Sequence, residues 1–127
     1  MQENPIIEDK ILANTDVLYF TFSGKLSESD ARNAEQSWRK FLSEQSTKYC
    51  HVWNCTEMTG YEPMARIIWQ KAMKELKGEI DEIWLISDST LIVAGAKIMS
   101  LFTSFDIHAV QSESEIITNL ESRVSAG

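Results

Sequence analysis

The chain has 127 residues, of which 43% are hydrophobic and 24% charged, and its formal charge is −7. Such a composition is typical of a globular protein and excludes a disordered chain. Twelve basic residues among nineteen acidic ones form no electropositive stripe, which argues against a nucleic-acid partner.

No segment predicts a membrane span or an export signal. The longest apolar stretch, residues 91–105, is interrupted by Lys97 and three hydroxyl residues, and the N-terminal residues lack the charge and apolar run of a signal peptide. We therefore expect a cytoplasmic protein with reduced cysteines. Cys50 and Cys55 are five apart on one expected strand, so they should face opposite sides of it and form no disulfide with each other.

The first half of the chain predicts two strands, a helix and a third strand. The first strand covers residues 6–12, and residues 13–16 turn into a second over 17–22, because Asn and Asp suit tight turns. Ser27 and Asp30 approximate a capping box at the start of a helix. That helix is expected to bury Ala31, Ala34, Trp38, Phe41 and Leu42. Residues 49–55 are expected to form a central strand.

The second half alternates helices and strands. A loop over residues 56–61 leads to a helix begun by Pro63, with Ala65, Ile68, Trp69, Ala72 and Leu76 buried. A strand over 82–86 and N-caps within 87–90 precede a third helix. Its expected buried residues are Leu91, Ile98, Phe102 and Phe105, with Ile92, Ala94, Gly95 and Met99 widening the apolar arc.

The chain ends with a strand over residues 106–110, a short helix capped by Ser114 and a flexible tail over 121–127. We therefore expect a single α/β domain over residues 1–127, with its ordered core at 5–120. Its mixed sheet has an antiparallel opening pair and is flanked by about four helices.

Polar side chains follow two of the parallel strands, within residues 54–62 and 87–90, at the sheet edge where ligands bind in such folds. They are equally typical of turns and helix caps. Ser87 and Ser89 lack the sequence of a nucleophile elbow. Cys50, His51, Cys55 and His108 lack the spacing of a zinc site. We therefore predict no enzyme, no metal and no cofactor.

The chain carries more large apolar residues than its elements need. Trp38, Trp53, Trp69 and Trp84, one in each of four elements, are expected in the core. Met64 and Ile67 lie off the buried stripe of the second helix, and the third helix is apolar over half its circumference. Together they suggest an exposed patch for a partner or a cavity for an apolar ligand.

The strand over residues 17–26, ending in Gly-Lys-Leu before a helix, resembles the start of the anti-sigma-factor antagonist (STAS) domain. The resemblance spans residues 10–120 and includes the Ser-Glu-Ser-Glu-Ile near the end. Regulatory members carry Asp-Ser-Ser/Thr-Gly where this chain has Glu62-Pro63-Met64-Ala65, so it lacks the hydroxyl that a kinase would modify, although Thr59 lies nearby. Divergent SpoIIAA-like members resemble Sec14 lipid-transfer modules, which implies apolar-ligand binding as an alternative.

We therefore expect a bacterial regulatory module that binds a protein partner or a second copy of itself. The alternatives are a binder of a small apolar ligand and, third, an enzyme using the hydroxyl-rich strand ends. Neither nucleic-acid binding nor membrane insertion is expected. The expected binding residues lie in the second- and third-helix region and at the strand ends: Thr59, Tyr61, Glu62, Met64, Ile67, Ser87, Ser89, Ile92, Ala96 and Met99.

Overall fold

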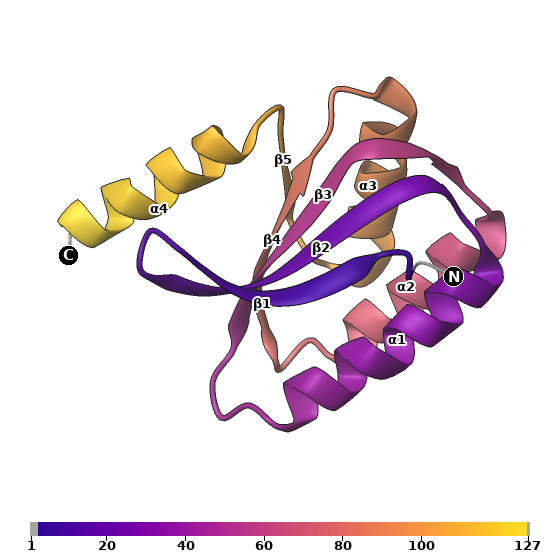
Figure 1. Ribbon diagram of the computed structural model, residues 1–127, viewed down its shortest axis with the longest axis horizontal. Helices are drawn as coiled ribbons and strands as arrows, with labels where there is room; N and C mark the ends of the chain where they lie inside the picture. The colour runs from indigo at the N-terminus through magenta and orange to yellow at the C-terminus, as the bar shows by residue number, and fades with distance from the viewer. Residues whose placement is uncertain (1–2, 127) are drawn as a thin grey trace.

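Strands and helices alternate along the chain in the order expected from the sequence. The computed structural model describes residues 3–126, with the side chains described up to Arg123 (Figure 1). The elements are β1 (Ile6–Leu12), β2 (Thr15–Leu26), α1 (Glu28–Ser43), β3 (Tyr49–Tyr61), α2 (Pro63–Glu75), β4 (Ile80–Ile86), α3 (Thr90–Thr103), β5 (Ile107–Val110) and α4 (Glu113–Ala126).

The five strands form one sheet in chain order. β1 is antiparallel to β2, and the later neighbours are parallel. The turn between β1 and β2 consists of Ala13 and Asn14 at positive φ, a conformation that asparagine tolerates and that matches the twist of a hairpin. The expected mixed α/β sheet with an antiparallel opening pair is confirmed.

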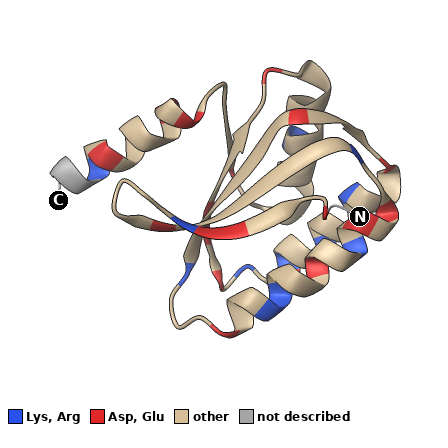
Figure 2. Ribbon diagram, in the orientation of Figure 1, with Lys and Arg blue, Asp and Glu red and all other residues tan. Residues whose placement is uncertain are grey.

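The helices divide unequally between the two faces of the sheet. α1, α2 and α3 cover one face and α4 lies on the other (Figure 1). Parallel strands require crossover connections, and α1, α2 and α3 supply them. Among the described residues, no helix is both long and apolar enough to cross a membrane. Acidic and basic residues are interspersed along α1 (Figure 2).

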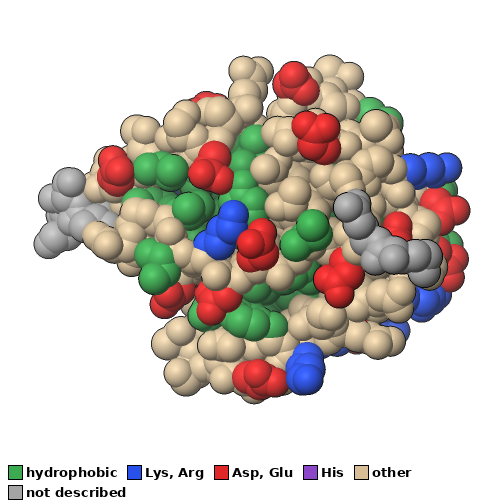
Figure 3. All heavy atoms as spheres, viewed as in Figure 1, with side chains coloured by type: hydrophobic (Ala, Val, Ile, Leu, Met, Phe, Trp, Pro, Cys, Tyr) green, Lys and Arg blue, Asp and Glu red, His purple; other side chains and the backbone are tan. Residues whose placement is uncertain are grey.

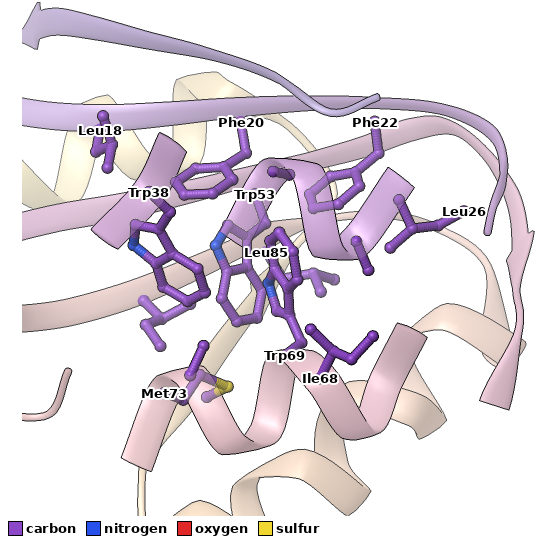
Figure 4. Close-up of a cluster of buried hydrophobic side chains, with 14 of the residues drawn as sticks. Leu18, Phe20, Phe22, Leu26, Trp38, Trp53, Ile68, Trp69, Met73 and Leu85 are labelled. Carbon is purple, nitrogen blue, oxygen red and sulfur yellow. The ribbon is translucent and has the colours of Figure 1, made fainter. Parts of the chain in front are cut away.

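The larger core, under α1 to α3, is built around aromatic side chains. Phe20 of β2 lies edge-on to Trp38 of α1, with ring centroids 5.4 Å apart, and Trp38 lies 5.0 Å from Trp69 of α2 (Figure 4). Trp53 of β3 completes the cluster. Trp84 faces the smaller core, where Ile116 and Leu120 of α4 cover the sheet. All four tryptophans are buried, as expected.

A histidine is fully buried in the larger core. The indole N–H of Trp38 donates to His51 Nε2 at 2.9 Å, and His51 Nδ1 lies 2.9 Å from the Tyr49 carbonyl oxygen. Both ring nitrogens therefore have partners when the ring is neutral with its proton on Nδ1. Burial lowers the pKa of His51 to about 4. His51 is thus part of the core.

The helix starts follow the expected chemistry. The Ser27 hydroxyl accepts from the Asp30 N–H, and the Asp30 carboxylate accepts from the Ser27 N–H, completing the capping box. Pro63 occupies the first turn of α2, and the Ser89 hydroxyl accepts from the Ile92 N–H at the start of α3.

Two segments are more regular than expected. Residues 56–61, expected as a loop, continue β3, because residues 23–26 of β2 extend alongside them. α4 begins at Glu113 rather than after Ser114 and runs to Ala126. Most of the expected flexible tail is therefore helical, and Gly127 lies outside the described residues.

Candidate binding site

A cavity of about 50 Å³ lies between the sheet, α2 and α3, on the face that carries the larger core. It is near the carboxyl ends of the parallel strands, the region where open α/β sheets bind ligands. Its wall is almost wholly apolar. The wall residues come from β2, β3, β4, α2 and α3: Phe22, Leu26, Trp53, Cys55, Met58, Tyr61, Ala65, Arg66, Trp69, Leu85, Ile92, Gly95, Ala96 and Met99.

Residues 23–26 of β2 and 56–61 of β3 extend together beyond the rest of the sheet, and we call this pair of segments the arm; it forms one side of the cavity. Register shifts interrupt the pairing at Gly24, whose positive φ of 59° suits a glycine at such an irregularity. The arm carries Met58 and Tyr61 into the wall. The Glu62 N–H then donates to the Leu26 carbonyl at 2.9 Å, which ties the end of β3 to the end of β2.

Tyr61 also fixes how closely α3 approaches. A Cβ at Gly95 would collide with the Tyr61 hydroxyl and would lie 3.0 Å from the ring carbon that bears it. Glycine costs helical stability relative to alanine, so a glycine in mid-helix usually has a packing reason. Here Gly95 makes room for Tyr61, the expected binding residue on the arm.

The expected orientation of α3 is wrong. Ile92 and Ala96, two of the expected binding residues, are 4% and 3% exposed and line the cavity, and Met99 beside them is half-buried. The expected core residues Leu91, Ile98 and Phe102 face solvent instead. The apolar residues of α3 cover about half of its circumference, more than one buried stripe needs, so the sequence does not determine which part of that arc packs inward. The small residues Gly95 and Ala96 decide it, because they allow α3 to lie close to Tyr61 and the sheet.

The outer face of α3 is consequently apolar and exposed. We call Leu91, Ile98, Leu101 and Phe102 the α3 face; their exposed fractions are 58%, 38%, 83% and 59%. The spacings of three, four and seven residues place these side chains on one side of the helix. Single exposed apolar residues are ordinary, but four on one helix face form a patch.

The expected binding residues at the start of α2 differ in whether they are available to a partner. Met64 and Ile67 are exposed. Glu62, at the N-cap of α2, has its carboxylate engaged by the Glu28 N–H at 2.7 Å, so it caps the start of α1 across the structure. Its carboxylate is therefore already bound.

The hydroxyl residues at the strand ends do not form one cluster. Ser87 is buried, and its hydroxyl accepts from the Ser89 N–H at 3.0 Å, while Ser89 caps α3. Both line a shallow open groove at the start of α3 with Thr90, Lys97 and others. Thr59 lies on the β3 arm, is exposed and lines neither this groove nor the cavity. The alternative reading of these serines as turn and cap residues fits their contacts.

The two cysteines and two histidines do not form one cluster within the described residues. Cys50 faces the smaller core and Cys55 the larger one, so the expected opposite placement is confirmed. Burial raises the pKa of both thiols to about 12, which keeps them protonated at neutral pH. Within residues 3–126, no three metal-ligating side chains converge.

Three features of this region were not predicted from the sequence. Arg66 lines the cavity, although a lone arginine on a helix usually indicates a solvated side. Met58 enters the wall only because the β3 arm is a strand. Leu101, the most exposed large apolar side chain described, carried no signal that separated it from the expected core residues of α3.

The opposite side of the sheet also shows apolar side chains. In Figure 3 they gather near the middle of the visible face, where α4 meets the strands, and acidic side chains border them. Ile116 and Leu120 of α4 are buried there against Val17 and Trp84. These side chains belong to the smaller core, which α4 covers. Among the described residues, the α3 face has no such covering helix.

Comparison with known proteins identifies the fold. The structure is similar to that of an uncharacterized protein of the DUF3478 family with a SpoIIAA-like fold from Shewanella loihica PV-4. The TM-score is 0.77 at 16% identity, over 94% of this chain and 96% of that one. It is also similar to the anti-sigma factor antagonist SpoIIAA in its unphosphorylated form, with a TM-score of 0.63 at 11% identity, over 96% of this chain and all of that one.

No protein-family model matches the sequence, and no curated protein matches it. The structural likenesses nevertheless confirm the resemblance inferred from the residues at the level of fold. The chain has a divergent STAS-like, SpoIIAA-like α/β fold.

Proposed function

We propose that the chain is a non-enzymatic regulatory module that binds a protein partner through the α3 face. The observation that carries the proposal is the exposure of four large apolar side chains on one side of α3, led by Leu101. The fold is also that of an anti-sigma factor antagonist, a protein whose description implies action on another protein. A site on a shared fold still has to be argued from its own residues.

The size of the α3 face suits a protein interface. At roughly 200 Å² for a large side chain, the exposed fractions of its four residues amount to about 500 Å² of apolar surface. One side of a standard interface buries about 800 Å², of which somewhat more than half is apolar. The α3 face therefore supplies roughly the apolar area that one partner contributes to a standard interface.

The polar residues near the site support a binding role over a catalytic one. Ser87, Ser89 and Glu62 are occupied in helix caps and backbone hydrogen bonds. His51 is buried with both ring nitrogens hydrogen-bonded, so it lacks a free nitrogen to act as a general base. A cytoplasmic location is part of the same proposal.

Photo-crosslinking in the natural host tests the proposal. A crosslinking amino acid at position 101 should yield one discrete adduct with a second polypeptide, or with a second copy of the chain. The same amino acid at position 11 is the matched control, because Ile11 is also a large apolar residue, 70% exposed, but lies on the edge strand β1. Absence of an adduct at position 101, or equal adducts at both positions, would contradict it.

The cavity favours a second candidate function, the binding of a small apolar ligand. Its wall combines aromatic, aliphatic and methionine side chains from five elements. Ligand pockets are typically lined in this way, with few polar groups. Binding of a small molecule below α3 is compatible with binding of a partner outside it, because Ile92 and Ala96 point inward while the α3 face points outward.

A further inference from the structure

We propose that the cavity binds a small anionic amphiphile, with the apolar body of the ligand inside and its carboxylate paired with Arg66. The proposal develops the second candidate function, since it assumes that the cavity binds a ligand, and it adds the charge and size class of that ligand. It is argued from the partners of Arg66, the polar groups of the wall and the cavity volume.

Arg66 differs from the other arginines of the chain. Arg32, Arg39 and Arg123 each pair with a carboxylate at 3.0 Å or less. Arg66 is half-buried, and no acidic side chain of residues 3–126 forms an ion pair with it, in a protein with nineteen acidic residues. Arg66 belongs to the cavity wall, and an arginine can pack its aliphatic stem on apolar groups while its guanidinium pairs with an acid brought from outside.

Among the described residues, the wall has no group that would pair with a cation. Trp53 and Trp69 are buried, and their indole N–H groups have no acceptor within the described part of the chain. The Cys55 thiol stays protonated, and no Asp or Glu lines the cavity. A cation would find no carboxylate here, so charge complementarity selects an anion.

The volume limits the size of the ligand. A group the size of a water molecule needs roughly 10–15 Å³ of cavity volume. The cavity of about 50 Å³ therefore admits on the order of four methylene groups. A long acyl chain does not fit this arrangement of side chains. Met58 and Met99 in the wall are flexible and can adjust to a slightly larger body. A short-chain carboxylate fits the volume, the apolar wall and the cation together.

Hexanoate and the neutral 1-hexanol are suitable probes, and NMR of the indole N–H groups is a direct readout. Trp53 and Trp69 belong to the wall, so their indole signals should shift on titration with hexanoate. The Trp84 indole donates to Glu82 on the opposite face of the sheet and should not shift, which makes it an internal control. We expect hexanoate to bind about tenfold more tightly than 1-hexanol, because a hydrogen bond to a charged group is among the stronger polar contacts.

Arg66→Gln should lower the affinity for hexanoate about tenfold and leave that for 1-hexanol unchanged. The matched control is Arg32→Gln, which removes an exposed arginine on α1 that pairs with Glu28; it should change neither affinity. Equal binding of both probes, unaffected by Arg66→Gln, would overturn the charge assignment and leave the second candidate function standing. If neither probe shifts the Trp53 and Trp69 signals, both the assignment and the candidate function are wrong, while the partner proposal is untouched.

Discussion

The orientation of α3 predicts opposite outcomes for two isoleucines on the same helix. Ile92 is 4% exposed and lies against the cavity, whereas Ile98 is 38% exposed on the α3 face. Replacing either with alanine removes three carbon groups, worth roughly 0.8 kcal/mol each if fully buried. At Ile92 the enlarged cavity adds to this loss, so we expect Ile92→Ala to cost about 3 kcal/mol of unfolding free energy. At Ile98 solvent fills the space, and we expect a cost of about 1 kcal/mol or less.

Urea unfolding followed by tryptophan fluorescence measures both values, because the buried indoles become exposed on unfolding. With a slope of about 2 kcal/mol per molar urea, Ile92→Ala should lower the midpoint by roughly 1.5 M and Ile98→Ala by about 0.5 M or less. The two substitutions are matched in chemistry and helix, so the difference reports orientation alone. Equal shifts, or a larger shift for Ile98→Ala, would refute the orientation of α3 and with it the exposed α3 face.

Three further predictions concern the core and the caps. The pKa of His51 is about 4 in the folded protein and about 6.5 in the unfolded chain, so the unfolded chain binds the proton more tightly. The free energy of unfolding should therefore fall by on the order of 3 kcal/mol as the pH drops from about 6.5 to about 4. Urea midpoints across that range test this, and a pH-independent midpoint would contradict it. Gly95→Ala should lower the melting temperature despite the better helix propensity of alanine, and Tyr61→Phe in that background should restore part of it. Ser27→Ala should cost about 1 kcal/mol, measured by urea unfolding, and a neutral result would show that the capping box is not stabilising.

Most of the fold was predictable because each element carried a local signal. Alternating side chains marked β2, where Leu18, Phe20 and Phe22 face the larger core. Capping residues at Ser27 and Ser89 marked helix starts, and both are used as expected. The order of these signals was enough for the mixed sheet, because parallel strands joined by helices have few alternative topologies.

The errors arose where the deciding contacts are distant in sequence. Residues 56–61 contain threonine, glutamate and glycine and resemble a loop, yet they form a strand because β2 extends beside them. The apolar arc of α3 is too broad to show which part is inward, and the close approach of Gly95 to Tyr61, a residue distant in sequence, helps to decide it. A periodic pattern was not available to predict either feature.

The positions of the expected binding residues were predicted in part. Met64 and Ile67 are exposed as expected, and a cavity does lie between the two helices and the sheet. Ile92 and Ala96 belong to that cavity and not to the outer surface. Met99→Asp should destabilise the fold, because it places a carboxylate beside an apolar cavity.

The central claim is that the α3 face binds a protein, and native mass spectrometry of the protein purified from its natural host tests it most directly. The double variant Leu101→Lys/Phe102→Lys removes the two most exposed residues of the face, and lysine in the last turn of a helix is compatible with its dipole. Ile11→Lys, on edge strand β1, is the matched control.

We expect the wild-type chain and Ile11→Lys to retain a second polypeptide, or a second copy. Loss of at least 2 kcal/mol of binding free energy, roughly thirtyfold in affinity, should remove it from the double variant while the melting temperature is unchanged. A wild-type chain that carries no polypeptide, or a double variant that retains it in full, would contradict the claim.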